Sequence, residues 1–262
     1  MPTYCYVKWD FGIPEVNDVQ MDVTVHMDLP NFPWMYLQTY EFRMYIKRPE
    51  FKGLGIYSYH GLQSNVYDPL SNSGRGKGVL FSRYETLDPN DLSIGSGGWY
   101  EIPDAAKIVA EGGKYVSVRN TFQWGKGQYR LSLFPLNEDD VGLWYCFRVL
   151  DLLNGRECNC GSLRFPKLGK RPGIPNLGTT FLEMYPQNND PASFPFWHIS
   201  IHNIKANQGQ LNAKSAIVTY DDNQIPGRNS DVSLGAGNQA IEFKVGSGVM
   251  RNTVNGTVLH LQ

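Results

Sequence analysis

The chain has 262 residues, 19% of them charged, and a formal net charge of −1. This length allows one large domain, or one domain with a smaller addition, and it suffices to bury a sizeable core. The low and nearly balanced charge argues against disorder and against a nucleic-acid or acidic membrane partner held by bulk charge. No window approaches about 18 consecutive apolar residues, so we expect no membrane-spanning helix.

Two compartments are compatible with the chain. Its first residues show no basic-then-apolar signal peptide, which leaves a cytosolic protein or a mature secreted domain whose Met1 was added for expression. We favour the extracellular location, because low charge with abundant Tyr, Trp, Asn and Gly is common in secreted β domains that handle sugars.

The four cysteines leave their chemistry open. Four allow three disulfide connectivities, and free buried or loop thiols are a further interpretation. The close pair, Cys158 and Cys160, has one intervening residue and no histidine near it in the sequence, which disfavours a zinc site. The other two are Cys5 and Cys146.

Alternation of apolar and polar residues predicts β-strands along most of the chain. In residues 19–27 the apolar side chains occupy every second position, and His26 falls on the opposite, solvent-facing side. The 27 glycines and 16 prolines supply the turns that many short strands need. Further strands are predicted at residues 4–9, 36–46, 53–61, 79–84, 115–118, 141–150, 162–165, 179–185 and 196–204.

Residues 120–134, NTFQWGKGQYRLSLF, carry the pattern around which the other strands are arranged. Their aromatic residues and leucines recur mostly at every second position. Gly125 and Gly127 interrupt this pattern, and glycine tolerates the positive φ of a tight turn. We therefore predict a β-hairpin here, within a sheet that packs on a second layer.

The remaining pattern predicts little helix and a change of composition near the C-terminus. No stretch of about 12 residues shows a helical period with caps, and residues 137–140 open a single helical turn at most. Residues 207–262 are poorer in aromatics, with candidate strands at 215–220, 239–245 and 253–261. We predict an all-β fold: residues 1–206 form a two-sheet antiparallel sandwich, jelly-roll or lectin-like, and residues 207–262 form a smaller β extension packed on it.

The order of several segments is similar to that of an uncharacterised domain family of secreted β-rich proteins. These segments are GLGIYSYHGLQSN (53–65), VLFSRYE (79–85), a glycine-rich loop ending at Trp99, FQWGKGQYRLSLFP (122–135), GLWYCFRVLD (142–151) and FLEMY (181–185). The similarity covers about residues 1–200. Members of that family often occur near carbohydrate-active modules, so the resemblance implies glycan handling.

The loops around residues 57–68 and 83–85 form our candidate ligand site. Glycan binding needs flat aromatic faces ringed by amide, carboxylate or guanidinium groups, and core packing of the aromatics is the alternative. Tyr57 and Tyr59 alternate on one strand face, and Trp34 and Tyr67 are further loop aromatics. The predicted ligand-binding residues are Tyr57, Tyr59, His60, Gln63, Asn65, Asp68, Arg83, Glu85 and Trp99.

Carboxylates for a hydrolytic reaction are scattered. Glycosidases usually use two of them, and no E-x-D-x-E run on alternate strand positions is present. Glu41 and Glu183 lie in aromatic-rich strands, where desolvation would raise the pKa of a carboxyl group, although a structural hydrogen-bond acceptor is the alternative. The other loose candidates are Asp10, Glu85 and Asp88.

The sequence predicts no metal or cofactor site. His198 and His202 are four residues apart on a predicted strand, hence about 13 Å apart and too far for one ion. The acidic pairs at 139–140 and 221–222 lie in turn contexts that suit calcium, but neither has the EF-hand spacing. Calcium therefore remains only an alternative.

These observations leave three classes of function. We predict a lectin-like glycan-binding protein without catalysis, because the candidate loops combine aromatic and amide side chains. The alternative is a glycan-active hydrolase or lyase that uses paired carboxylates. A further alternative is a structural or interaction module of the adhesin or toxin kind. The identity of the sugar and the oligomeric state are not determined by the sequence.

Overall fold

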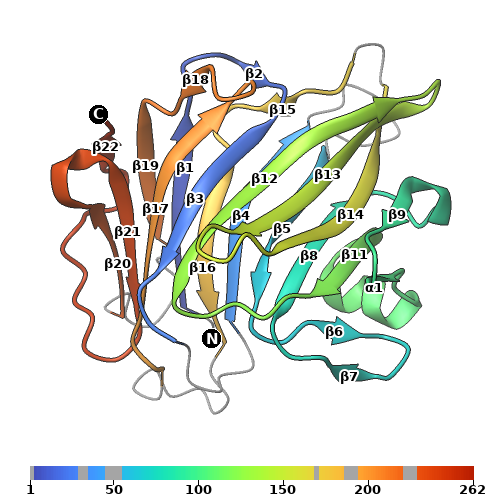
Figure 1. The fold of residues 1–262 in the computed structure, drawn as a ribbon, viewed down its shortest axis with the longest axis horizontal. Coiled ribbons are helices and arrows are strands. Elements are labelled where there is room, and N and C mark those ends of the chain that lie inside the picture. Colours follow the sequence, from blue (N-terminus) through green and yellow to red (C-terminus); the bar gives the residue numbers. More distant parts are fainter. Residues whose placement is uncertain (1–2, 29–34, 45–54, 168–170, 186–193, 221–228) are drawn as a thin grey trace.

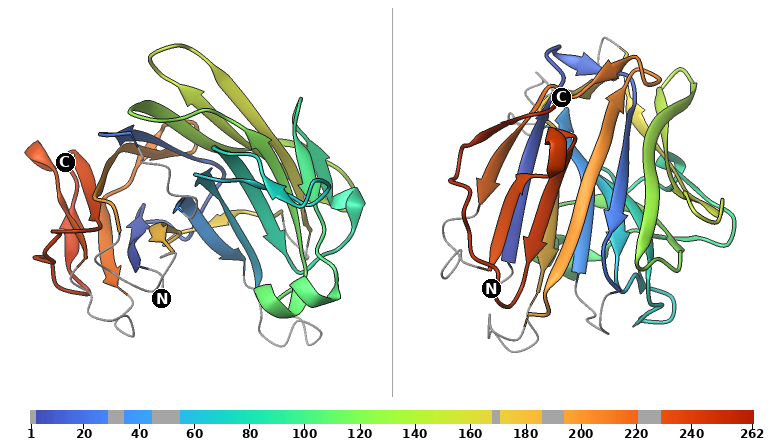
Figure 2. Two further views of the ribbon diagram at one scale, coloured as in Figure 1. Left: turned by 90° about the horizontal axis from the view of Figure 1, so that it is seen from below. Right: turned by 60° about the vertical axis from the view of Figure 1, so that its left-hand side comes forward.

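The computed structural model describes residues 3–28, 35–44, 55–167, 171–185, 194–220 and 229–262. These residues form two antiparallel β-sheets packed face to face, which confirms the predicted all-β sandwich (Figure 1). The two layers curve together, with the first sheet on the inner side of the curve (Figure 2). No helix within these ranges is long and apolar enough to cross a membrane.

Nine strands make up the first sheet. Their spatial order is β10 (Trp99–Glu101), β11 (Tyr115–Thr121), β8 (Gly78–Tyr84), β5 (Ile56–Gln63), β4 (Met35–Met44), β16 (Thr179–Met184), β1 (Thr3–Asp10), β19 (Ser215–Tyr220) and β22 (Val258–His260). Every neighbouring pair is antiparallel.

The second sheet also has nine strands. Its main order is β20 (Ser230–Leu234), β21 (Ala240–Val245), β17 (Trp197–Ala206), β3 (Val19–Val25), β12 (Gly127–Glu138), β13 (Gly142–Asp151), β14 (Glu157–Pro166) and β9 (Leu92–Ile94), with β18 (Leu211–Asn212) on β17. Two short pairs lie outside both sheets: β2 (Glu15–Val16) with β15 (Ile174–Pro175), and β6 (Tyr67–Asp68) with β7 (Ser73–Gly74).

The hydrophobic core lies between the two sheets. Trp9 on β1 and Trp197 on β17 are fully buried, as are the apolar residues that alternate along β3. The opposite faces of β3 and β17 carry polar residues such as Thr24 and His198, because successive side chains of a strand point to opposite sides. Each sheet therefore has one inner apolar face and one outer face that is free to carry a site.

The C-terminal residues extend both sheets. β19 pairs with β1 and β22 with β19 in the first sheet, whereas β20 and β21 continue the second sheet from β17. Val218 and Phe243 in these strands are fully buried in the shared core. The region after residue 206 therefore packs on the rest as the continuation of both layers.

The hairpin predicted at residues 120–134 is wrong. β11 belongs to the first sheet and β12 to the second, so residues 122–126 carry the chain from one layer to the other. Phe122 and Trp124 are buried along this crossing. A crossing and a hairpin produce the same alternation, because both place every second side chain in the interior.

The structure contains a helix that the sequence analysis did not predict. α1 (Ala105–Glu111) starts at Asp104, whose side chain accepts a hydrogen bond from the Lys107 N–H at 2.9 Å, and ends at Gly112, where φ is +74°. Residues 137–140 do not form the helical turn that we considered, because Glu138 is the last residue of β12. Two 3₁₀-helices, Pro89–Asp91 and Ala236–Asn238, complete the helical elements of the described ranges.

Candidate functional site

A cavity of about 1070 Å³ lies on the outer face of the first sheet. Its walls come from strands β1, β4, β5, β8, β11 and β16, and α1 lies at one end. The volume is at the upper end of the range of ligand pockets, so it suits an extended ligand. The lining residues are Tyr6, Tyr36, Gln38, Glu41, Tyr57, Tyr59, Gln63, Asn65, Tyr67, Tyr84, Lys107, Ala110, Tyr115, Arg119, Phe181, Glu183 and Tyr185.

Gln38 and Glu183 lie at the centre of this cavity, on the adjacent strands β4 and β16. Gln38 is opposite Phe181 in the register, so Glu183, two residues further along β16, is its diagonal neighbour. Diagonal side chains on one sheet face are about 7–8 Å apart at their origins, within reach of long side chains. The ladder between β4 and β16 therefore places a carboxamide and a carboxyl group within reach of one another in one cavity.

Both central side chains are largely buried. Gln38 is 2% exposed and Glu183 is 9% exposed. Within the described residues, the Oε1 atom of Gln38 has no hydrogen-bond partner. A buried carbonyl oxygen without a partner is costly, and in a cavity it points to a bound ligand or an ordered water.

A β-bulge brings Glu41 to the same face. The pairing of β4 with β5 shifts register between Gln38 and Phe42, and Tyr40 within this segment has φ of +63°. Regular alternation would place Tyr40 in the cavity and Glu41 in the core. With one extra residue, Tyr40 is fully buried and Glu41 lines the cavity instead. Positive φ in a bulky residue is a strained arrangement of the kind found at functional sites.

The surroundings of Tyr40 hold this bulge in place. Its hydroxyl donates to the Pro175 carbonyl at 3.0 Å, and its backbone N–H donates to Thr180 Oγ1 at 3.4 Å. The same Thr180 oxygen accepts a 2.6 Å hydrogen bond from the indole of Trp9. Position 178 accommodates only glycine, because a Cβ there would lie 2.0 Å from the Tyr40 ring.

Tyrosines flank the central pair on both sides. On one side, the rings of Tyr57 and Tyr59 (β5) lie 5.1 Å and 6.0 Å from Tyr84 (β8), which is 5.4 Å from Tyr115 (β11). On the other side Tyr6 and Phe181 are 5.5 Å apart, and Tyr36 and Tyr185 are 5.8 Å apart. The cavity is thus an aromatic groove that runs across the strands, with Gln38 and Glu183 near its middle.

Glu41 and Tyr57 are linked within this groove. Burial, followed by the nearby charge of Glu41 and a hydrogen bond to it, raises the pKa of Tyr57 far above its ordinary value. The Tyr57 hydroxyl therefore stays protonated and donates to Glu41. Glu183 lies on β16 four residues beyond Thr179, which is the residue opposite Glu41 in the register.

The end of the cavity beneath α1 carries cationic groups. Arg119 and Lys107 both form ion pairs with the buried Glu101, and Arg119 also donates to the Tyr67 carbonyl at 2.9 Å. The Lys107 ammonium lies 4.4 Å from the centre of the Tyr67 ring. These contacts hold both cations at the cavity wall, where they can meet an anionic or carbonyl group of a ligand.

Four of the predicted ligand-binding residues line this cavity together: Tyr57, Tyr59, Gln63 and Asn65. The two tyrosines face outward as the strand alternation predicted. Asn65 is also used structurally, because its Oδ1 accepts a hydrogen bond from the Gly76 N–H at 3.0 Å.

His60 and Arg83 face the core instead. His60 alternates with Tyr59 and is 2% exposed, with its ring 4.7 Å from that of Phe147. Arg83 is 5% exposed and forms an ion pair with Asp91 at 2.9 Å. The prediction that Arg83 binds the ligand is therefore not supported by its position, and its neighbour Tyr84 is the residue that lines the cavity.

Asp68, Trp99 and Glu85 also lie away from the groove. Asp68 is fully buried and accepts hydrogen bonds from Ser71 and Arg75, so it stabilises the β6–β7 turn. Trp99 is 7% exposed and its indole donates to the Tyr67 carbonyl at 3.0 Å, which makes it a packing residue rather than a ligand platform. Glu85 is exposed just after β8, with φ of +68°.

The other candidates from the sequence have structural contacts. Asp10 accepts hydrogen bonds from Asn176 and from the Gly12 N–H, and these lower its pKa. Asp88 accepts from the Asn90 N–H at the start of a 3₁₀-helix. The oxygens of Asp139 accept from two backbone N–H groups and from the Trp144 indole, which leaves them poorly suited to calcium. Trp34 and the acidic pair at 221–222 lie outside the described residues.

All four cysteines are free and buried. Burial raises the pKa of Cys146 and of Cys158 to about 11. The structure therefore agrees with the interpretation of free, buried thiols. Because burial disfavours the thiolate form, none of the four cysteines is an activated nucleophile.

Sequence reasoning missed Gln38 and most of the aromatic groove. Tyr6, Tyr84 and Tyr115 come from strands far apart in the chain, and nothing local marks them as neighbours. No feature of the sequence indicated that Gln38, a single amide in an aromatic-rich strand, lies in a binding site. The only sequence feature that pointed to the centre of the cavity was the presence of Glu41 and Glu183 in such strands.

Comparison with known proteins adds distant similarities. No family model and no curated protein matches the chain. Among solved structures it is similar to scytalido-glutamic peptidase with a peptide-based transition-state analogue, at 9% identity and a TM-score of 0.44 over 93% of this chain and 98% of that one. It is also similar to SCP-B, a member of the Eqolisin family of peptidases, in a complex with a tripeptide, at 8% identity and a TM-score of 0.41 over 93% and 98%.

Proposed function

We propose that this protein is a hydrolase that binds an extended peptide in the aromatic groove and cleaves an amide bond with Gln38 and Glu183. The observation that carries the proposal is the buried carboxamide of Gln38, whose Oε1 lacks a partner within the described residues, diagonal to the Glu183 carboxyl group in one cavity. In acyl hydrolysis a carboxyl group can act as general base and acid, and an amide N–H group can stabilise the negative charge that develops on the carbonyl oxygen.

The two side chains have separate roles in this reaction. The Glu183 carboxylate takes a proton from a water molecule whose oxygen attacks the carbonyl carbon of the scissile bond. The Gln38 amide N–H group donates to the oxyanion that forms, and its carbonyl oxygen orients the attacking water. Glu183 then returns the proton to the leaving nitrogen, the C–N bond breaks, and the products are a carboxylic acid and an amine.

The arrangement favours amide cleavage over cleavage of a glycosidic bond. A glycosidase needs two carboxyl groups that act on opposite sides of one bond. The second carboxylate in this cavity, Glu41, is engaged by the Tyr57 hydroxyl and lies four register positions from Glu183. Gln38 is the nearer neighbour of Glu183, and an amide cannot serve as a second acid.

A glycan-binding role remains the second candidate, and the tyrosines support it. Four tyrosine rings on β5, β8 and β11 lie within 6.0 Å of a neighbour and form a continuous aromatic wall. Aromatic faces pack against the C–H surfaces of sugars as well as against peptide side chains. In this role the groove would bind a sugar chain without cleaving it.

The test is cleavage of a fluorogenic peptide library between pH 3 and 8, with a glycan array and reducing-sugar release in parallel. We expect peptide cleavage by the parent, a loss of about 10²–10⁴-fold in Glu183→Gln and of about 10²–10³-fold in Gln38→Ala. Glu157→Gln, an exposed carboxylate outside the cavity, is the matched control and should cleave like the parent.

The other outcomes separate the alternatives. Sugar release that is lost in both Glu41→Gln and Glu183→Gln would replace the proposal with a paired-carboxylate glycosidase. Glycan binding that is equal in the parent and in Glu183→Gln, without any cleavage, would support the binding role. Peptide cleavage that persists in Glu183→Gln would exclude Glu183 as the base.

A further inference from the structure

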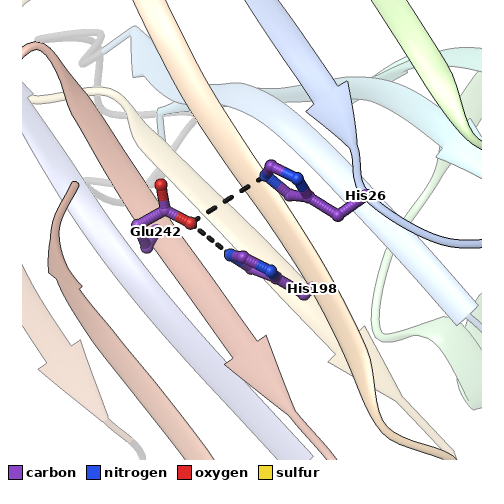
Figure 3. A group of neighbouring side chains, drawn as sticks. All are labelled: His26, His198 and Glu242. Carbon is purple, nitrogen blue, oxygen red and sulfur yellow. Dashed lines mark hydrogen bonds and ion pairs between the residues drawn. The ribbon is translucent and has the colours of Figure 1, made fainter. Parts of the chain in front are cut away.

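Two histidines and a glutamate converge on the outer face of the second sheet, on the other layer of the sandwich from the aromatic groove. His26 directly follows β3, His198 lies on β17 and Glu242 lies on β21. These are three neighbouring strands in space, although the residues are up to 216 positions apart in the chain (26 to 242). Figure 3 shows both imidazole rings directed toward the Glu242 carboxylate.

The donor atoms of the three side chains lie close together. One ligand atom from each residue falls within 4.8 Å of the other two. The two imidazole rings stack with centroids 4.0 Å apart and planes 15° apart. Glu242 Oε2 contacts His198 Nε2 and lies 4.0 Å from His26 Nε2. Zinc bonds of about 2.0–2.1 Å place ligand atoms roughly 3.3 Å apart, so small side-chain rotations bring these atoms around one ion.

A neighbouring hydroxyl fixes the carboxylate. Ser200 Oγ donates a 3.0 Å hydrogen bond to Glu242 Oε1 and also contacts His26 Nε2. This leaves Oε2 of Glu242 directed at the histidines. Outer hydrogen bonds of this kind orient the ligands of natural metal sites.

The backbone beneath the cluster is rigid, because each strand is held by its ladder. His26 N–H donates to the His198 carbonyl at 3.2 Å, and β17 pairs with β21 over six residues, with His198 opposite Lys244 and Ser200 opposite Glu242. The side chains are 38%, 22% and 18% exposed for His26, His198 and Glu242. A hydrated ion can therefore reach the cluster, and water can complete its coordination.

We propose that His26, His198 and Glu242 bind a divalent first-row transition metal, with Zn²⁺ as the representative ion, and leave at least one coordination position open to water. Two imidazoles and one carboxylate are the ligand set of many zinc sites with an open position. Imidazole nitrogen is a poor ligand for Ca²⁺ and Mg²⁺, which prefer oxygen. The bound ion links β3, β17 and β21, so it stabilises this edge of the sandwich.

The sequence pattern drew attention to a different pair of histidines. His198 and His202 both lie on β17, and His202 forms a hydrogen bond with Thr24. The partner of His198 comes from β3, which the fold brings beside β17. This metal site is independent of the proposed hydrolase activity, because no residue of the aromatic groove takes part in it.

The experiment is a calorimetric titration of the protein, purified without a histidine tag, with Zn²⁺, together with Co²⁺ absorption spectra and thermal unfolding with and without metal. We expect one Zn²⁺ per chain and a rise in Tm at saturation. His26→Ala, His198→Ala and Glu242→Gln should each weaken the affinity by tenfold or more and abolish the rise in Tm. Glu242→Gln keeps the hydrogen-bonding shape of the side chain, so it separates a metal ligand from a simple hydrogen-bond acceptor.

His202→Ala is the matched control, since it removes a histidine from the same face of β17 outside the cluster. It should bind Zn²⁺ within twofold of the parent. Melting of all variants without metal checks that each is folded. The proposal is overturned if the parent binds no Zn²⁺, if His198→Ala binds as tightly as the parent, or if His202→Ala loses as much affinity as the cluster variants.

Discussion

The buried hydroxyl of Thr180 lies beside the bulge that turns Glu41 into the groove. This oxygen accepts the indole N–H of Trp9 at 2.6 Å and, at a longer 3.4 Å, the backbone N–H of Tyr40. Thr180, Trp9 and Tyr40 are all fully buried. Thr180→Val keeps the shape and the strand preference of the side chain, but it leaves the Trp9 indole without an acceptor.

The expected loss follows from that orphaned donor. A buried donor that loses its partner costs about 1–3 kcal/mol, and the long Tyr40 contact adds little, so we expect a loss of about 2 kcal/mol. For a domain of this size that corresponds to a fall in Tm of about 4–8 °C. Trp9→Phe removes the indole N–H itself, so in that background the Thr180→Val change should cost less than about 1 kcal/mol.

The assay is urea unfolding followed by tryptophan fluorescence, for the parent, both single variants and the double variant. Thr121→Val is the control, because Thr121 is exposed at the end of β11 and should change stability by less than about 0.5 kcal/mol. If Thr180→Val costs as much with Phe at position 9 as with Trp, the loss does not come from the hydrogen bond between Trp9 and Thr180, and the reasoning about this buried donor fails.

Three further predictions concern a buried ion pair, the stability of the protein at acidic pH, and the cysteine thiols. Asp91→Asn leaves the buried Arg83 guanidinium without its ion-pair partner. The free energy of unfolding, measured by urea denaturation, should therefore fall by about 3–5 kcal/mol. A loss below about 1 kcal/mol would contradict the pairing. Hydrogen bonds from the Trp144 indole and the Gly142 N–H lower the pKa of Asp139 from 3.8 to about 2. The contribution of Asp139 to the free energy of unfolding is therefore complete above about pH 4 and is lost as the pH falls toward 2. Asp139→Asn should flatten the plot of unfolding free energy against pH between these values and leave its shape above about pH 4 unchanged. The four buried thiols should react with Ellman's reagent only after denaturation, when four equivalents are expected; fewer would indicate disulfides.

Strand positions were the part of the fold that local pattern could predict. The run at 141–150 corresponds closely to β13 (Gly142–Asp151), and the run at 19–27 contains β3 (Val19–Val25). A strand with one buried face has a period of two whatever its partner, so its existence is visible in the sequence. The same period does not indicate which sheet the strand joins, so the sequence predicts a hairpin where β11 and β12 belong to different sheets.

The short helix shows a different limit. α1 has only seven residues, too few for a helical period, although its Asp104 cap and its closing Gly112 are both visible in the sequence. These caps would have been the signal to use. The helix bears on the candidate site, because Lys107 and Ala110 of α1 line the cavity.

What the sequence by itself determined was the class of fold, the facing of Tyr57 and Tyr59, and the two glutamates in aromatic strands. Each is a local property, set by alternation and by the neighbours in the chain. Only the tertiary structure decided that Gln38 lies diagonal to Glu183 and that His26 stacks on His198, because these contacts join strands more than 100 residues apart (38 to 183, and 26 to 198). Register between distant strands, and the bulge that turns Glu41 outward, arise from packing the whole sandwich and have no signature in any single segment.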